Sequence, residues 1–243
     1  MLSLEKQNRW RDAYRLSHPD WRPATEVFAT YVRRELKPES RILDLGCGRG
    51  GLLEQLTHPL SRAMGIDPDY ISLREHRLPR LPRAVALSDC LPIVAESFDI
   101  VTGSWLLEHL ADPARTFSAA SRVLQPGGAF IFITPNASHP IAWLNRIAGR
   151  LGWAQGQMVA RIYGRAGDDT FSTFYRANTP AVIDGLARGA QLNLETLELI
   201  PDPSYLAFNR LLFNGMSAID DRLPARRRIH IVGVARKPGS SQS

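Results

Sequence analysis

Residues 41–51 read Arg-Ile-Leu-Asp-Leu-Gly-Cys-Gly-Arg-Gly-Gly, and this stretch decides the fold. It begins as a short apolar strand that ends at an acid, Asp44, and glycines then occupy positions 46, 48 and 50. The next run, residues 52–56, reads as a helix. Glycine lets the backbone approach a ligand closely, and free N–H groups at a helix start favour anionic ligand groups. The stretch therefore predicts a strand, a glycine turn and a helix that form a nucleotide-type pocket.

The spacing of these glycines argues against a nicotinamide dehydrogenase, which shares the same general fold. The dinucleotide fingerprint is G-x-G-x-x-G, whereas this chain has G-x-G-x-G, with Asp44 two residues before the first glycine. That pattern suits a cofactor with a zwitterionic amino acid head better than one with a pyrophosphate. A tight turn without any ligand remains the alternative for this stretch taken alone.

Two further apolar segments end in acids after the glycine turn. The strand predicted at 63–67 ends in Asp67-Pro68, about 20 residues beyond Gly48, where an acid can hydrogen-bond a ribose diol. A third strand, from Ala84, ends in Ser88-Asp89, and a carboxylate there can accept a hydrogen bond from an adenine amine. An ordinary turn or helix-cap aspartate is the alternative at position 67.

Two more segments complete the pattern. Residues 98–104 read as a fourth strand, and it runs into a loop with Ser104, Trp105 and the sequence Leu-Glu-His-Leu at 107–110. A helix then ends at Pro126-Gly-Gly, where a fifth strand begins, because glycine and proline are expected at a helix end.

In this order the segments resemble the class I S-adenosylmethionine-dependent methyltransferases, in particular the bacterial small-molecule and lipid group with a type 11-like domain. The resemblance covers about residues 23–136 well and the C-terminal part only loosely. The matching pieces are 44–50, Asp67, Asp89, 98–101, 107–110 with Asp112-Pro113, and 124–128.

This resemblance implies S-adenosylmethionine as methyl donor, S-adenosylhomocysteine as product, and no metal. Asp44 and the glycine turn would hold the methionyl head. Asp67 would hold the ribose and Asp89 the adenine amine. Ser104 and Trp105 would line the pocket near the sulfonium. The expected cofactor-binding residues are Asp44, Gly46, Cys47, Gly48, Asp67, Pro68, Asp89, Cys90, Ser104 and Trp105.

A hydroxyl acceptor must also lose its proton, and His109 is the expected catalytic base because an imidazole titrates in the useful range. A histidine packed for structure is the alternative, and Glu108 beside it is expected to hold cofactor or orient the loop. His139 and Tyr163 are expected to contact the acceptor. The remaining histidines show no functional pattern: His18, His58, His76 and His230.

Strand and helix patterns alternate to about residue 134, which predicts an α/β fold with helices on both faces of a parallel sheet. The resemblance implies a Rossmann-like three-layer αβα sandwich whose seven-stranded, mostly parallel sheet has an antiparallel last strand. We expect a helical cap at residues 1–22 and one methyltransferase domain at 23–243. Insertions at about 136–178 and 204–222 are expected to cover the acceptor.

Composition fits one globular domain. The chain has 243 residues, of which 44% are hydrophobic, and no apolar run is long enough for a membrane span. Residues 1–6 lack the apolar core of a signal peptide, so a cytoplasmic location is expected. The two cysteines, Cys47 and Cys90, can form neither a disulfide framework nor a metal site.

The net charge of +6 is compatible with nucleic acid, an anionic membrane surface or an anionic substrate. No basic block interleaved with aromatics appears, so no nucleic-acid partner is expected. The amphipathic stretch 204–222 beside Arg226–Arg228 could rest on a membrane surface.

The sequence thus predicts methyl transfer to a small-molecule or lipid-linked acceptor, with an oxygen as the methylated atom, in secondary-metabolite, glycan or lipid biosynthesis. An N- or C-methyltransferase acting on a small molecule is the first alternative, and an RNA methyltransferase is a further one. A cofactor-binding protein without enzymatic activity is the last.

Overall fold

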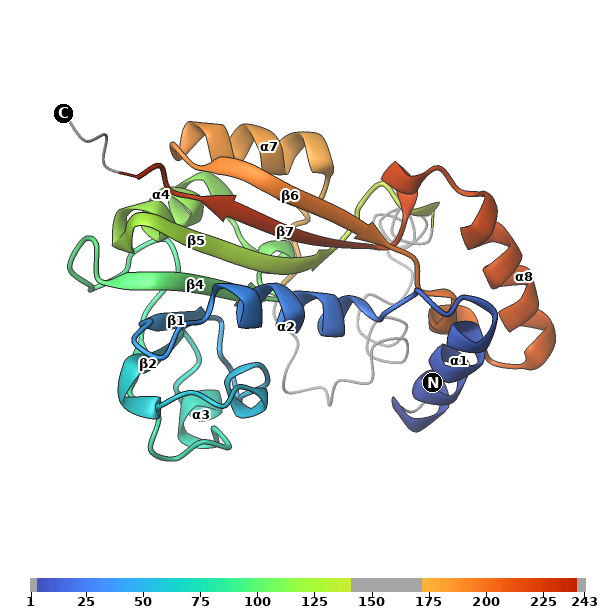
Figure 1. Cartoon of the computed structure of the whole chain (residues 1–243), viewed down its shortest axis with the longest axis horizontal. Helices are drawn as coiled ribbons and strands as arrows, with labels where there is room; N and C mark the ends of the chain where they lie inside the picture. The colour runs from blue at the N-terminus through green and yellow to red at the C-terminus, as the bar shows by residue number, and fades with distance from the viewer. Residues whose placement is uncertain (1–3, 141–171, 240–243) are drawn as a thin grey trace.

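Seven strands form one sheet in the order β3-β2-β1-β4-β5-β7-β6 in the computed structural model, which describes residues 4–140 and 172–239 (Figure 1). Strands β1 to β5 pair in parallel, and β7 lies antiparallel between β5 and β6. The predicted mostly parallel sheet with an antiparallel last strand is therefore confirmed. The strands are β1 (Ile42–Leu45), β2 (Ala63–Asp67), β3 (Arg83–Val85), β4 (Phe98–Ser104), β5 (Leu124–Pro135), β6 (Asn193–Ile200) and β7 (His230–Arg236).

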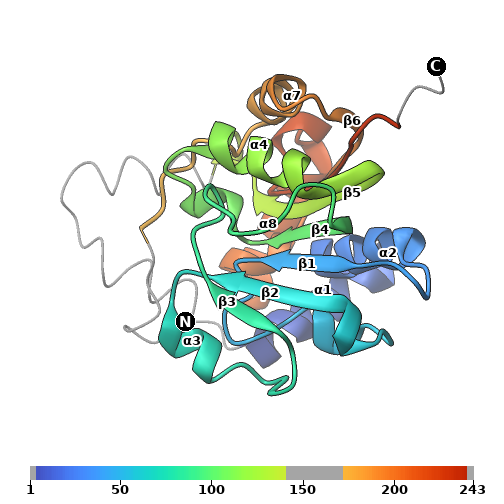
Figure 2. The same ribbon diagram turned by 90° about the vertical axis from the view of Figure 1, so that its left-hand side faces the viewer.

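Helices cover both faces of this sheet, as Figure 2 shows, with α2 on one face and α4 and α7 on the other. The helices are α1 (Leu4–Ser17), α2 (Ala24–Glu35), α3 (Tyr70–Arg74), α4 (Pro113–Val123), α7 (Pro180–Gly189) and α8 (Arg210–Arg222). Short 3₁₀ turns are η1 (Leu53–Gln55), η2 (Leu60–Arg62), η3 (Leu107–His109), η5 (Pro203–Leu206) and η6 (Ala225–Arg227). The three-layer αβα sandwich is thus confirmed.

Side chains along the central strands point alternately to the two faces of the sheet, and they form two separate hydrophobic cores. Ile42 and Ile100 face the core under α2, while their neighbours Leu43 and Val101 face the core under α4 and α7. Successive side chains of a strand point to opposite faces, so a strand covered on both sides is apolar throughout. All four residues of β1 are buried, and this includes the acid Asp44.

Three local predictions were wrong. The helix predicted at residues 52–56 is instead the single 3₁₀ turn η1. Glycines precede this segment and Pro59 follows it closely, so a longer helix has no room, and one turn is enough to bury its leucines. Strand β3 ends at Val85, so Asp89 lies in the loop beyond it. Residues 126–128 lie within β5, because Leu124 already pairs with Phe98 and because Lys237 exchanges backbone hydrogen bonds with Gly127 and Gly128.

The N-terminal helix α1 packs against η5 and α8. Trp10 stacks on Phe213 with ring centroids 4.7 Å apart, and Arg11 pairs with Asp202 at 2.8 Å. The division of the chain into a cap at 1–22 and one domain at 23–243 stays a prediction. Within residues 4–140 and 172–239, no helix is long and apolar enough to cross a bilayer.

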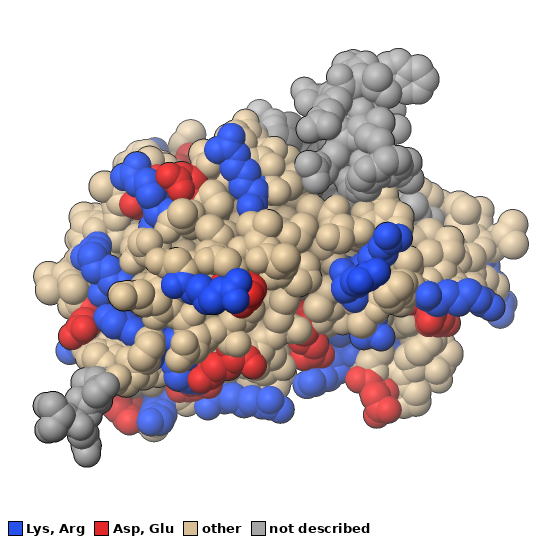
Figure 3. Space-filling model, turned by 90° about the horizontal axis from the view of Figure 1, so that it is seen from above, with Lys and Arg blue, Asp and Glu red and all other residues tan. Residues whose placement is uncertain are grey.

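Charged side chains are mixed on the face that Figure 3 shows. Lysine and arginine side chains are scattered there among aspartates and glutamates, and they form no continuous basic patch on that face. Basic side chains are also paired with acids in the described part of the chain, as in Arg236, which binds Glu35 and Glu195 at 2.8 and 2.7 Å.

Candidate cofactor and acceptor site

The carboxyl ends of β1, β2 and β4 meet at one edge of the sheet, which is where ligands bind in open α/β folds. The glycine turn leaves β1 at this edge. Its first two N–H groups, from Gly46 and Cys47, donate to the carbonyl of Ile66 at 2.8 and 3.1 Å. These two hydrogen bonds hold the turn against the end of β2, and the rest of the turn lies at the edge of the sheet.

The glycines of this turn are required by backbone geometry. Gly46 and Gly48 have φ values of +69° and +48°, in the left-handed region that side chains rarely adopt. A Cβ atom at position 46 would also lie 3.1 Å from Cδ1 of Leu106, in the loop after β4. Glycine therefore allows the cofactor loop and the loop after β4 to come together.

Asp44 is a buried carboxylate in the middle of β1. It is 5% exposed, and its Oδ1 accepts a hydrogen bond from Thr102 Oγ1 at 2.8 Å. Burial raises the pKa of Asp44 to about 7, and the nearby Asp67 adds to that rise while the Thr102 hydrogen bond opposes it. A cationic group placed here would favour the ionised carboxylate.

Asp67, the last residue of β2, connects the glycine turn to the segment that follows β2. Its Oδ2 accepts from the Gly48 N–H at 2.8 Å, and its Oδ1 accepts from the Asp69 N–H at 2.8 Å. Each carboxylate oxygen has a second lone pair, so ribose hydroxyls can still donate to it. Pro68 follows as an exposed residue.

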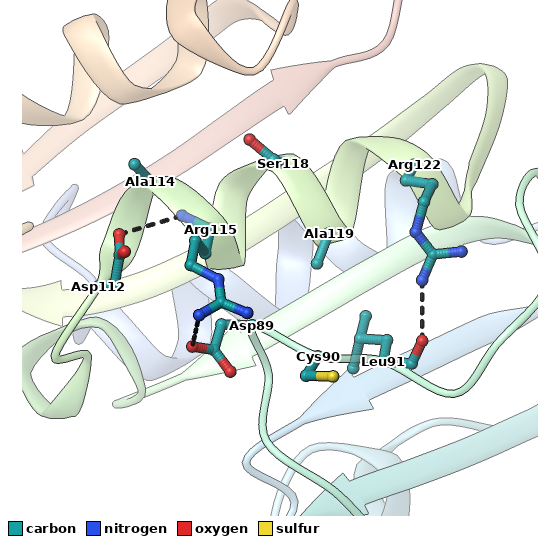
Figure 4. A pocket seen from close by; sticks show the side chains of 9 residues that line it. All are labelled: Asp89, Cys90, Leu91, Asp112, Ala114, Arg115, Ser118, Ala119 and Arg122. Carbon is teal, nitrogen blue, oxygen red and sulfur yellow. Dashed lines mark hydrogen bonds and ion pairs between the residues drawn. The ribbon is translucent and has the colours of Figure 1, made fainter.

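Asp89 and Cys90 lie beside a cavity of about 510 Å³ between the loop after β3 and α4 (Figure 4). Figure 4 shows Arg115 of α4 reaching toward Asp89, at 3.9 Å from Oδ2. Asp89 Oδ1 is buried and has no hydrogen-bond partner among the described residues. The lining residues are Asp89, Cys90, Leu91, Asp112, Ala114, Arg115, Ser118, Ala119 and Arg122. Because the glycine turn does not line it, this cavity borders only the predicted adenine end.

The two cysteines differ in surroundings. Cys47 is buried within the turn, and burial raises the pKa of its thiol, with Asp44 and Asp67 adding to the rise. Its thiol therefore stays protonated and packs as a small apolar group. Cys90 is exposed. No group of three or more His, Cys, Asp or Glu side chains suitable for a metal ion occurs in the described part of the chain.

Trp105 begins the loop after β4, at the carboxyl edge of the sheet. Ser104 closes β4, and Trp105 follows with φ +54°, while its N–H donates to Ile133 at 3.0 Å. Its ring meets the ring of His230 edge to face, with centroids 5.1 Å apart. Trp105 therefore lies beside the first residue of β7, at the same edge of the sheet as the glycine turn.

The residues at this edge fit S-adenosylmethionine. A buried carboxylate at Asp44 suits the ammonium of the methionyl head, and a glycine turn with positive φ leaves room for a ligand beside its backbone. The buried Asp89 Oδ1 can accept from an amine. The structure thus brings the predicted residues 44–48, 67 and 104–105 together, with Asp89 and Cys90 at the margin.

His109 lies in η3, just beyond β4. Its Nδ1 is 3.1 Å from the Ser172 carbonyl oxygen, which can only accept, so Nδ1 carries the hydrogen and the lone pair of the neutral ring lies on Nε2. The preceding Glu108 is buried and accepts from Thr134 Oγ1 at 3.0 Å, and Asn178 in turn donates to Thr134 at 2.6 Å. Glu108 therefore holds the end of β5 and the chain near Asn178 together.

Sequence reasoning missed His230, Thr102 and Asp220. His139, one of the predicted acceptor contacts, is 1% exposed and lies beside Asp220, while Tyr163 lies outside the described residues. His230 had shown no pattern, yet it begins β7 at the same edge. An antiparallel last strand starts where its parallel neighbours end, and that rule could have located it.

The order of the strands is that of the Rossmann-like methyltransferase fold. Residues 43–132 match the sequence model of a family described as a methyltransferase domain. The order of its strands and these matched residues make the chain similar to the class I S-adenosylmethionine-dependent methyltransferases.

Among curated proteins, the chain is similar to ubiquinone biosynthesis O-methyltransferases. That of Hahella chejuensis is 33% identical over 153 residues, 58% of this chain and 62% of the relative. That of Nitrosococcus oceani is 30% identical over 164 residues, 65% of each. The chain thus spans less than two thirds of the length of these relatives.

Solved structures support the fold. One belongs to a Haloferax volcanii complex between the Trm112 methyltransferase activator and a methyltransferase, with TM-score 0.62, 19% identity, and 98% of this chain and 99% of that chain covered. Another is an S-adenosylmethionine-dependent methyltransferase from Mesorhizobium loti, with TM-score 0.59, 20% identity, and 86% and 96% covered.

Proposed function

We propose that this protein transfers a methyl group from S-adenosylmethionine to a hydroxyl oxygen of a small molecule. The observation that carries the proposal is the arrangement of Asp44, the glycine turn and Asp67 at the carboxyl edge of the sheet. The curated relatives named as O-methyltransferases support oxygen as the methylated atom. An N- or C-acceptor, or an RNA, is the alternative.

The bound cofactor supplies a methyl group that is already electrophilic on its sulfonium. Asp44 would bind and orient the methionyl head, and the backbone of the glycine turn would hold it at the carboxyl edge of the sheet. His109 takes the proton of the acceptor hydroxyl at Nε2, since its Nδ1 donates to Ser172. The residues align the reactants and exclude water, which can supply several kcal/mol of the barrier.

A methyl-label experiment tests this function. S-adenosylmethionine with a labelled methyl group is incubated with pure protein and an extract of the source cell, and the lipid, small polar, nucleic-acid and protein fractions are separated. We expect label in the lipid or small-molecule fraction, carried by an ether oxygen. Label in RNA or protein would contradict the proposed acceptor class and leave the cofactor site intact.

Replacing Asp67 by alanine is expected to weaken cofactor binding. The change removes the acceptor of the Gly48 N–H and, in the proposed site, that of the ribose hydroxyls, which together contribute roughly 1–3 kcal/mol. Calorimetric titration with S-adenosylhomocysteine measures the loss. An affinity equal to that of the unmodified protein would mean that the ribose binds elsewhere.

Replacing His109 by alanine is expected to leave cofactor binding unchanged and to lower turnover at least tenfold, because general base catalysis typically contributes more than that. Initial rates of methyl transfer at saturating cofactor give the measurement. A matched control is His58→Ala, since His58 Nε2 contacts the Ser40 carbonyl, which precedes the amino end of β1, at the opposite edge of the sheet from His109. Full turnover in the His109 variant would mean that His109 is not the base and that alignment of the two reactants is sufficient for methyl transfer.

We also infer that α8 contacts an anionic bilayer. Leu211 is 81% exposed on this helix, and the exposed Arg210 and Arg222 flank it. Three more large apolar side chains are exposed on α8 or within two residues before it: Phe208, Leu212 and Ile219. A lipid-linked acceptor would be reached from such a surface.

Flotation with phosphatidylglycerol vesicles at low salt tests this contact. We expect the protein to rise with the vesicles and Leu211→Asp to rise less, because the change places a charge in the apolar contact. Val94→Asp is the matched control, since Val94 is 79% exposed and lies in the loop before β4. Protein that stays at the bottom of the gradient would refute the contact.

A further inference from the structure

Four polar side chains from distant parts of the chain gather beyond Trp105, and we call them the acceptor-side cluster. They are His139 after β5, Tyr205 in η5, Asp220 in α8 and His230 at the start of β7. The Tyr205 hydroxyl lies 2.8 Å from His230 Nε2, and His139 Nε2 lies 3.5 Å from Asp220 Oδ1. None of these contacts is needed to build the sheet, so the cluster calls for an explanation.

The cluster buries hydrogen-bonding capacity that the chain does not use. His230 is 2% exposed, and its Nδ1 has no hydrogen-bond partner among residues 4–140 and 172–239. Asp220 is 4% exposed, and neither carboxylate oxygen accepts a hydrogen bond in that part of the chain. Nearly all buried polar atoms in folded proteins are paired, and leaving a carboxylate without hydrogen bonds is costly. A ligand that offers hydroxyl groups would supply partners to both residues.

The cluster lies at the same edge of the sheet as the cofactor site, and the loop after β4 runs between them. The glycine turn approaches Leu106 at position 46, and Leu106 follows Trp105 in the chain. The Trp105 ring touches the His230 ring, and the Tyr205 ring lies 5.3 Å from it, centroid to centroid. A molecule held by the cluster would therefore lie beside Trp105, at the same edge of the sheet as the cofactor turn.

The charges around the cluster disfavour an anionic ligand. Burial lowers the pKa of His230 to about 4, so its ring is neutral at physiological pH. Arg11 is already paired with the buried Asp202 at 2.8 Å. Arg228 donates to the Leu199 carbonyl through Nη1, while its buried Nε has no hydrogen-bond partner among the described residues. Within the cluster itself, Asp220 would repel an anion and accept from a hydroxyl.

We propose that the acceptor-side cluster is a specificity site that holds the methyl acceptor by adjacent hydroxyl groups, so that the acceptor is a neutral polyhydroxylated compound. Tyr205 and His230 bind one hydroxyl, and Asp220, oriented by His139, accepts from the next. A sugar ring and a dihydroxylated aromatic ring share this pattern. The inference rests on the proposed function and adds the residues that choose the acceptor.

The test uses labelled S-adenosylmethionine and small-molecule extract of the source cell with Tyr205→Phe and Asp220→Asn. Both substitutions keep the side-chain shape, and thermal unfolding checks that each variant folds. At limiting extract we expect each to incorporate at least tenfold less label, with recovery when the extract is concentrated and with unchanged S-adenosylhomocysteine affinity. The matched controls are Tyr31→Phe, which removes a hydroxyl bound to Glu198, and Asp221→Asn, on the same helix as Asp220.

The labelled product identifies the ligand class. We expect it to pass an anion exchanger, and acid hydrolysis then places the label either in a monosaccharide or in an aromatic compound. Retention on the exchanger, or full labelling by both variants at limiting extract, would overturn the specificity site. Absence of label from every fraction with unmodified protein that binds S-adenosylhomocysteine would instead refute the proposed methyl transfer, and the specificity site with it.

Discussion

Replacing Asp44 by asparagine is expected to make the free protein more stable while it weakens cofactor binding. The folded pKa of about 7 lies above the unfolded value of 3.8, so above pH 7 folding buries an ionised carboxylate at a cost. A shift of about three pKa units corresponds to at most about 4 kcal/mol. Asparagine removes that charge and can still accept from Thr102.

The stability gain has a defined pH dependence. Between pH 3.8 and 7 the folded protein holds a proton that the unfolded chain has released, so the cost of Asp44 fades as the pH falls through 7. We therefore expect the free energy of unfolding of Asp44→Asn to exceed that of the unmodified protein by on the order of 1–4 kcal/mol at pH 8, and by almost nothing near pH 4. Urea unfolding at the two pH values measures both differences.

Cofactor binding should move the other way. The proposed contact joins the Asp44 carboxylate to the ammonium of the methionyl head, and a hydrogen bond to a charged group is worth roughly 1.5–3 kcal/mol. Calorimetric titration with S-adenosylhomocysteine at pH 8 should show a corresponding loss of about ten- to a hundredfold. The control Asp184→Asn, in a surface pair with Arg188, should change neither quantity. Tight binding of S-adenosylhomocysteine by the Asp44 variant would mean that the methionyl head binds at another part of the edge.

This opposition between stability and binding is typical of a ligand site. A buried ionised acid in the central strand lowers the free energy of unfolding, and a bound cationic group offsets that loss. Asp220 is a second buried acid, with His139 at 3.5 Å. The proposed cofactor and acceptor ends of the site thus each contain a buried acid.

The order of the sheet could be predicted because each parallel strand is apolar and ends in a recognisable turn or acid. The glycine spacing at 46–50 predicts the cofactor class, and the distance of Asp67 along the chain predicts its role at the ribose. Position 89 was predicted as a strand end and lies in a loop instead, because the short strand β3 stops at Val85 once its pairing with β2 ends at Asp67. Short edge strands carry too little pattern to fix their bounds.

The acceptor end could not be predicted in the same way. His139, Tyr205, Asp220 and His230 are far apart in the sequence and meet only because β7 turns back between β5 and β6. Local periodicity records which face of an element is buried, but not which elements meet across the sheet edge. The partner of His139 therefore had to come from the structure.

Replacing Gly46 by alanine is expected to disable the cofactor turn. A residue with a Cβ atom at φ +69° costs about 1–2 kcal/mol, and contact with Leu106 Cδ1 at 3.1 Å adds overpacking of typically about 1–3 kcal/mol. Leu106 is packed against the core under α4 and α7, so it has little room to give way. Either the turn moves away from the sheet edge or the loop after β4 shifts with Trp105.

Both shifts should reduce S-adenosylhomocysteine affinity at least tenfold and lower the melting temperature, measured by calorimetry and thermal unfolding. Gly51→Ala is the matched control, since it adds the same methyl group one residue beyond the turn, and nothing lies within 4 Å of its Cβ position. That variant should keep both the affinity and the stability. If Gly46→Ala also binds the cofactor normally, the left-handed turn shapes only the backbone, and the ligand must contact the edge through Asp44 and Asp67 alone.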